Sequence, residues 1–183
     1  MIVTDLKILR QVSQPLKTMY GVKTTVEKLK KALKTGWTEG VGLTAIQIGI
    51  PKRIAWLKFD DGEEITLINP KIIDRSKEKL LEKEGCLSIF NVWTPVVRSK
   101  IILVDINSFA GEDELTRECT VYKDFKARAI QHIIDLMDGI LPIDKEAKLV
   151  KKPVPKNTSI CQKKDKIRAR RKRQRKARKR KRK

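Results

Sequence analysis

Positive charge is concentrated at one end of this chain, and this limits which part of it can fold. Residues 151–183 contain 19 Lys and Arg against the single acid Asp165, whereas residues 1–150 contain 24 basic and 21 acidic residues. A segment with so much like charge and so few apolar residues cannot bury a core, so it should be disordered when free. We therefore predict a globular domain over residues 1–150 and a basic tail over residues 151–183.

Two helices are predicted within residues 1–150. The first begins near Thr24, because Thr24 and Glu27 have the spacing of a capping box, and Gly36 suits its C-terminal end. The second begins near Tyr122 and stops at Gly139.

Three strands are predicted between these helices. Residues 53–59 and 64–70 read as strands joined by the turn DDGE, and residues 100–106 form a third. Consecutive apolar residues in this third strand predict burial on both of its faces.

The second helix carries the chain's one histidine on an apolar stripe. The stripe consists of Phe125, Ala129, His132, Ile133, Leu136 and Met137. A zinc helix of the H-E-x-x-H type has a similar pattern, but Ile133 replaces its glutamate and Leu136 its second histidine. On this helix alone, the ordinary interpretation of His132 is a packed and hydrogen-bonded core residue.

Two further motifs point to chemistry at the histidine. GVGLTAIQIGIP (residues 40–51) and EGCLSI (residues 84–89) precede QHIIDLMDGI. Their order and spacing are similar to G-x-G-L-A-A-x-Q, E-G-C-L-S and Q-H-E-x-x-H of the peptide deformylase family, and the resemblance covers nearly all of residues 1–150. It implies an α+β fold with antiparallel strands around a central helix that carries His132.

The resemblance also implies a catalytic metal site. In such an enzyme a thiolate and two imidazoles hold Fe, Zn or Ni, and the activated water attacks the formyl group of a nascent chain. Cys86 and His132 match two of the metal ligands. Gln47 and the backbone N–H of Leu87 match the donors that stabilise the oxyanion.

Two glycines belong to the same resemblance. Gly40 and Gly42 match the substrate loop, where glycine allows a close approach of the backbone.

The departures from the family pattern fall on the chemistry itself. Leu136 stands at the third-ligand position and Ile133 at the acid/base position, and loss of the general acid/base alone costs about 10²–10⁴ in rate. Asp135 and Glu84 belong to the family pattern beside its complete ligand set, so neither is a replacement, and Cys119 is not expected to be a ligand. We expect no metal or only a vestigial divalent ion. We also expect that the protein is not an enzyme.

The tail predicts an RNA partner. A dense polycation binds phosphate backbones by counterion release, and bacterial deformylases meet nascent chains at the ribosome. The residues expected to bind ribosomal RNA are Arg168, Arg170, Arg171, Lys172, Arg173, Arg175, Lys176, Arg178, Lys179 and Arg180. Two alternatives for the basic tail stay open: a nuclear import signal, and binding to acidic lipid surfaces.

The location of the protein is predicted from its cysteine count and from its lack of a visible signal or membrane-spanning stretch. Cys86, Cys119 and Cys161 are an odd number, and neither a secretory signal nor a membrane-spanning stretch is visible. We expect a ribosome-associated protein of the cytoplasm or an organellar matrix, neither secreted nor in a membrane.

Three functional hypotheses follow. The preferred one is a catalytically inactive deformylase homologue that associates with the ribosome or its RNA through the tail. The alternative is an active deformylase with an atypical metal shell, for which the intact GVGLTAIQ and EGCLS motifs argue. A third is a protein that binds formyl-Met or nascent-chain N termini without turnover.

Overall fold

The computed structural model describes residues 1–34, 40–109 and 115–147 of the chain. The helices are α1 (Leu6–Leu9), α2 (Val22–Lys34) and α3 (Asp124–Met137), with the 3-10 helices η1 (Ala45–Ile48) and η2 (Pro142–Lys145). The strands are β1 (Gly42–Thr44), β2 (Ile54–Lys58), β3 (Glu64–Ile68), β4 (Lys71–Arg75), β5 (Lys79–Cys86), β6 (Ile89–Ser99), β7 (Ile101–Phe109) and β8 (Leu115–Lys123).

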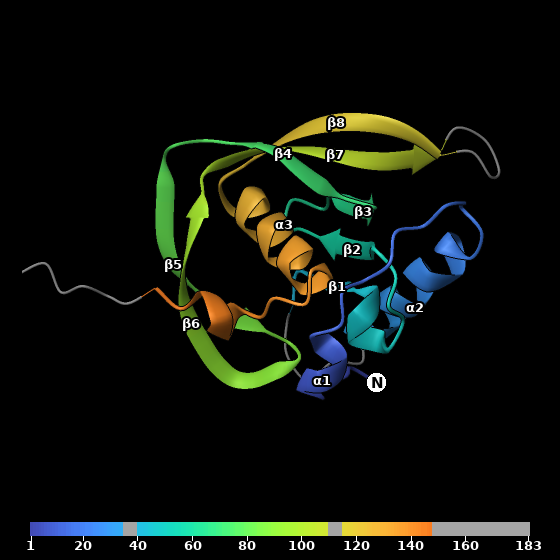
Figure 1. The fold of residues 1–183 in the computed structure, drawn as a ribbon, viewed down its shortest axis with the longest axis horizontal. Helices are drawn as coiled ribbons and strands as arrows, with labels where there is room; N and C mark the ends of the chain where they lie inside the picture. Colours follow the sequence, from blue (N-terminus) through green and yellow to red (C-terminus); the bar gives the residue numbers. More distant parts are fainter. Residues whose placement is uncertain (35–39, 110–114, 148–183) are drawn as a thin grey trace, which may run out of the picture. The chain divides into compact units, whose positions relative to one another are not determined.

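Within the described ranges these strands form three antiparallel sheets around α3. The orders are β1-β2-β3 and β4-β7-β8, and β5 pairs with β6 in a two-stranded ribbon. Figure 1 shows α3 in the centre of the view, with the β5–β6 ribbon on one side of it and β2 and β3 on the other. The predicted α+β fold, with antiparallel strands around the helix that carries His132, is confirmed.

The central helix is held by its apolar side. Ala127, Ile130, Ile134 and Met137 are buried in a core with apolar residues of β2, β3 and β7. The helix predicted from near Tyr122 begins at Asp124, because Tyr122 and Lys123 still belong to β8.

The predicted helix stop is at the expected glycine. Gly139 has a φ of 72°, and a Cβ there would lie 2.4 Å from the carbonyl oxygen of Arg10. A side chain at this position would meet both backbone strain and a backbone clash, so the glycine is required.

The first predicted helix was misplaced at its N-terminus. α2 begins at Val22, and the hydroxyl of Thr25 donates to the carbonyl oxygen of Gly21 at 2.9 Å. Thr24 and Glu27 therefore lie inside the helix, where they cannot form the predicted capping box. Gly36 lies outside the described residues.

The predicted hairpin is observed, and the predicted burial of the third strand is wrong on one face. β2 pairs with β3 around a turn in which Gly62 has a φ of 85°. In β7, Ile102 and Val104 are buried, whereas Ile101 is 37% exposed. The second face is only partly buried, because Ile101 is exposed, Leu103 is half-buried and Asp105 is buried.

A second core positions the loop that carries the first motif. Val26 and Leu29 of α2 pack with Leu43 of β1 and Trp56 of β2. This packing fixes β1, and η1 follows β1 directly, so the glutamine of η1 has a defined position.

The described residues all belong to one compact unit, Met1–Lys148. The predicted division at residue 150 and the predicted tail stay predictions, because residues 148–183 lie outside the described residues. None of the helices described has the length and apolar character needed to cross a membrane.

Candidate functional site

A pocket of about 340 Å³ opens between the loop before β1, the β5–β6 ribbon and α3. Its polar lining includes Gln47, Lys83, Glu84, Cys86, Arg128 and His132. Its apolar lining includes Leu57, Leu87, Ile89, Phe90, Val92, Trp93, Phe125, Ala129 and Ile133. All the sequence-predicted site residues of the globular domain except Leu136 line this pocket.

The glycines of the first motif are needed for packing within the chain. A Cβ on Gly42 would lie 2.5 Å from the carbonyl oxygen of Trp56, and one on Gly40 would lie 2.6 Å from Leu87 Cδ1. At Gly42 the obstacle is backbone, so the loop depends on glycine there to approach β2, whereas at Gly40 it is the end of a flexible side chain that could move. The predicted approach to a substrate stays a prediction.

The amide of Gln47 is fixed in orientation from both ends. Its Oε1 accepts hydrogen bonds from the backbone N–H of Thr44 at 2.9 Å and from the Thr44 hydroxyl at 3.1 Å. Its Nε2 donates to Ser88 Oγ at 3.1 Å and lies 3.9 Å from Cys86 Sγ. The amide N–H₂ therefore points at the cysteine, which is the direction an oxyanion donor needs.

Leu87, the other predicted donor, lies with Ser88 in the two-residue turn that joins β5 to β6.

Cys86 and His132 are brought together by β5 and α3, as the motifs predicted. His132 Nδ1 lies 3.1 Å from Glu84 Oε2, and Glu84 precedes Cys86 by two residues on β5. Burial opposes a charge on the imidazole, but hydrogen bonds to Cys86 and Glu84 outweigh it and raise the pKa of His132 to about 9. The histidine is thus oriented by a carboxylate and directed at the thiol.

Glu84 is the centre of a buried charge network that the sequence did not reveal. Arg98 donates to both of its carboxylate oxygens, at 2.9 and 2.8 Å, and Arg128 donates to Oε1 at 2.6 Å. Burial would raise the pKa of Glu84, but the hydrogen bonds from Arg98 and His132 lower it to about 2. The carboxylate is therefore charged and fully engaged, consistent with its interpretation as a residue that does not replace the missing one.

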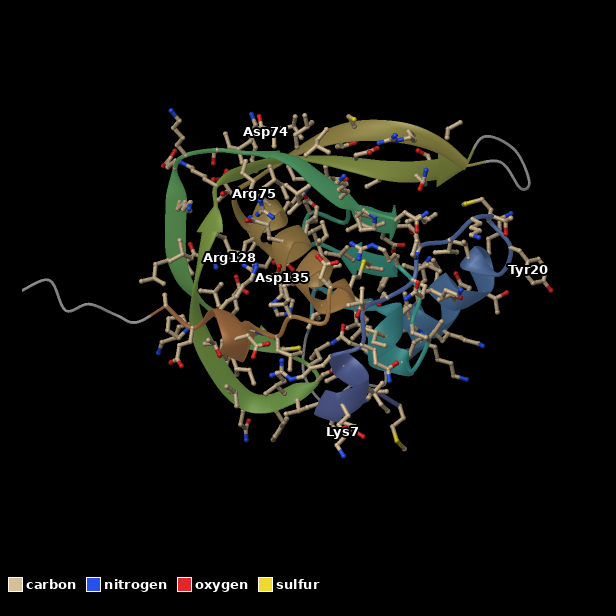
Figure 2. The ribbon with its side chains drawn as sticks, viewed as in Figure 1. Lys7, Tyr20, Asp74, Arg75, Arg128 and Asp135 are labelled. Carbon is tan, nitrogen blue, oxygen red and sulfur yellow. The ribbon has the colours of Figure 1, made fainter. Side chains whose placement is uncertain are left out.

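Asp135 joins the same network. Its carboxylate accepts from Arg98 and, at 2.6 Å, from Lys145 of η2. Figure 2 shows Arg128 and Asp135 on the side of α3 that faces the β5–β6 ribbon. Both partners of Asp135 are cations, and these two ion pairs tie α3 to β6 and to η2.

The two departures from the family pattern are built into apolar packing. Leu136 is 1% exposed and packs with Leu9 and Leu141, and the side chain of Cys86 packs against the same cluster. Ile133 is 4% exposed and belongs to the core under β2, β3 and β7, and it also lines the pocket.

The donor set does not fit the metal that the family pattern implies. Over residues 1–34, 40–109 and 115–147, no three His, Cys, Asp or Glu side chains gather where they could hold a metal ion. The third-ligand position offers a hydrocarbon side chain, and Glu84 and Asp135 are committed to arginines. Two protein ligands fall short of the three that catalytic zinc sites use.

Several residues at the pocket were missed by the sequence reasoning. Ser88, Arg98 and Arg128 hold its polar groups, and Phe90 and Trp93 border it with 66% and 68% of their surface exposed. Ser88 could have been found, because it ends the EGCLS motif.

The remaining sequence-predicted residues lie elsewhere. Cys119 is exposed on β8 and is not among the residues that line the pocket. The predicted RNA-binding residues of the tail lie outside the described residues.

Comparison with known proteins gives one consistent result. The family model for polypeptide deformylase matches residues 1–152. A peptide deformylase of Pseudothermotoga lettingae is 41% identical over 122 residues, covering 66% of this chain and 68% of that protein. A peptide deformylase of Rhizobium meliloti is 36% identical over 148 residues, covering 78% of this chain and 81% of that protein.

Solved structures agree with the sequence relatives. The crystal structure of peptide deformylase from Thermotoga maritima is similar with a TM-score of 0.72 and 29% identity, covering 81% of this chain and 97% of that one. A peptide deformylase from Plasmodium falciparum gives a TM-score of 0.70 at 30% identity, covering 84% of this chain and 90% of that one.

Proposed function

The chain belongs to the peptide deformylase family, and we propose that it keeps the family's fold and pocket without metal-dependent hydrolysis. We further propose that its basic tail associates with the ribosome or ribosomal RNA. The observation that carries the first part is the apolar packing of Leu136 and Ile133 at the third-ligand and acid/base positions.

Deformylation needs two chemical groups, which in the family pattern depend on positions 136 and 133. The first is a metal ion that lowers the pKa of a bound water, and the second is a carboxylate that moves its proton to the departing amine. A leucine and an isoleucine supply neither, and the nearest carboxylates, Glu84 and Asp135, are neutralised by Arg98. The residues that remain, Gln47 among them, can bind and orient a carbonyl group.

The second candidate is an active deformylase with an atypical metal shell. The relatives are named peptide deformylases, which favours this candidate over the first. The retained Cys86 and His132, and the amide of Gln47 directed at the cysteine, also speak for it.

Metal content and turnover separate the two candidates. The purified protein should contain iron, zinc and nickel well below stoichiometry, and its hydrolysis of a formyl-Met peptide should equal background. Stoichiometric metal that is lost on Cys86→Ser, together with turnover above background, would establish the second candidate and refute the first.

The tail association rests on charge. Residues 151–183 contain 19 of the 43 basic side chains, and each phosphate that a cation neutralises contributes about −0.9 to the log–log salt slope on a duplex. A chain ending at Val150 should keep its fold, because the fold's core lies before it, and lose co-sedimentation with ribosomes. The proposal fails if this truncated chain and the full chain bind ribosomes equally across a salt series.

A further inference from the structure

The surplus positive charge of residues 1–150 lies on a single helix. α2 contains five lysines and one glutamate, whereas residues 1–150 as a whole contain 24 basic and 21 acidic residues. Without α2 these residues would have 19 basic and 20 acidic side chains, a net charge of −1. The globular part of the protein is therefore nearly neutral apart from this one element.

The lysines of α2 lie on its solvent side. The opposite side buries Val22, Thr25, Val26, Leu29 and Ala32 against β1 and β2. Lys23, Lys28 and Lys34 are exposed, and none of the ion pairs found among the described residues engages them.

The one acidic residue of α2 is paired with a lysine of the same helix. Glu27 lies 3.5 Å from the ammonium of Lys30, which also pairs with Glu64 and lies over the ring of Trp56. On the exposed face, the lysines therefore outnumber this single, paired carboxylate.

An aromatic ring lies at the start of this face. Tyr20 is 89% exposed and precedes α2 by two residues, and Figure 2 shows its side chain pointing away from the fold. Lysines beside an exposed aromatic ring are the combination with which proteins hold single-stranded nucleic acid, by phosphate contact and base stacking.

We propose that the exposed face of α2, with Lys23, Lys28, Lys34 and Tyr20, binds the phosphodiester backbone of RNA. The partner class rests on the function proposed above, and the surface is separate from the tail. An acidic membrane is the weaker fit, because membrane-binding helices insert apolar side chains, and the apolar residues of this helix are buried in the core.

The main test compares four full-length proteins, and Tyr20→Ala and Tyr20→Phe are measured beside them. They are the unmodified chain, Lys23→Gln/Lys28→Gln/Lys34→Gln, a control with the same loss of charge on other elements (Lys77→Gln/Lys79→Gln/Lys123→Gln), and a tail variant with Arg170, Arg171, Arg173 and Arg175 changed to Gln. Binding to polyuridylic acid and to bulk ribosomal RNA is measured across a salt series, and circular dichroism checks each fold.

The α2 variant should bind RNA about tenfold more weakly at physiological salt, with a log–log salt slope less negative by roughly 2 to 3, since about 0.7–0.9 is expected per phosphate. The control variant should stay near the unmodified chain. Tyr20→Ala should weaken binding to polyuridylic acid, and Tyr20→Phe should not.

Equal losses in the α2 and control variants would mean that only net charge matters and would overturn the inference. Weaker binding of the α2 variant to phosphatidylserine vesicles, with unchanged RNA binding, would overturn it in favour of a membrane. If the tail variant binds RNA normally while the α2 variant does not, the proposed role of the tail fails and the inference about α2 stands.

Discussion

The two walls of the pocket differ in what they have kept. The loop wall, residues 40–47 and 84–88, presents polar groups whose orientation is fixed, such as the Gln47 amide between Thr44 and Ser88. The helix wall, residues 125–136 of α3, keeps His132 but has hydrocarbon at two positions where the family pattern has a polar side chain, Ile133 in the pocket lining and Leu136 outside it. The loop wall therefore has oriented hydrogen-bonding groups, whereas the helix wall has apolar packing at the two substituted positions.

This difference follows from what holds each wall. The polar groups of the loop wall satisfy one another by hydrogen bonds within the chain, so they do not depend on a metal for their position. A polar residue at position 136 would have no such partner, because Leu9, Leu141 and Cys86 surround it. Where a buried site loses its ion, the groups with other partners can stay, and those without become apolar.

The largest expected effect comes from placing the two polar side chains of the family pattern on the helix wall. Ile133→Glu combined with Leu136→His should bind zinc and raise turnover of a formyl-Met peptide by about 10²–10⁴ over the unmodified chain, because both the ligand set and the acid/base are completed. Elemental analysis and peptide hydrolysis measure the two effects. If the double variant folds yet gains neither metal nor turnover, the loop wall is not the intact half of a site.

The dependence of the loop wall on its charge network predicts the largest loss of stability. Arg98→Leu leaves Glu84 and Asp135 without their shared cation, and the free energy of unfolding should fall by about 3–5 kcal/mol. Urea denaturation measures it. Glu78→Gln, which breaks the exposed pair with Lys100, is the control and should change stability little; similar values for the two variants would contradict the buried network's role.

The apolar packing of the helix wall predicts a comparable or smaller effect. Leu136→Ala should lower the free energy of unfolding by about 2–5 kcal/mol, because it opens a cavity beside Leu9 and Leu141. Val121→Thr on the exposed side of β8 is the control, with an expected change within about 0.5 kcal/mol. A loss below that of the control would mean that the cluster around Leu136 is loosely packed.

The smallest expected effect is a loss of stability in acid, which should come from Glu84 on the loop wall. The pKa of Glu84 is lowered from 4.5 to about 2, so its stabilising contribution is fully present above pH 4.5 and is lost as the pH falls toward 2. Thermal unfolding followed between these values should show this loss in the unmodified chain, and Glu84→Gln should flatten the acid limb. An unchanged limb in that variant would show that Glu84 does not control it.

Periodicity identified the elements that have one continuous apolar face. α3, β2 and β3 follow a regular pattern, and their residues lie near the predicted bounds. β5 was missed because its sequence, KLLEKEGC, places Leu80 and Leu81 side by side on an exposed ribbon and buries a glutamate instead.

Part of the candidate site could be predicted, because some of its residues belong to short sequence motifs. Cys86, His132 and Gln47 were found from three short motifs, and the structure brings them to one pocket. Arg98 could not be found, because its partners Glu84 and Asp135 lie 14 and 37 residues away and a charged residue in sequence does not show whether its charge will be buried.

The packing of Leu136 against Leu9 and Leu141 also constrains how this sequence could acquire the polar side chains of the family pattern. Leu136→His alone places an imidazole among leucines without a metal to bind it, and Ile133→Glu alone buries a carboxylate in the main core. Each single substitution therefore passes through a less stable protein, and only the pair gives a use for either. On the function proposed above, a chain with deformylase chemistry is separated from this one by two substitutions that depend on one another, which is epistasis between positions 133 and 136.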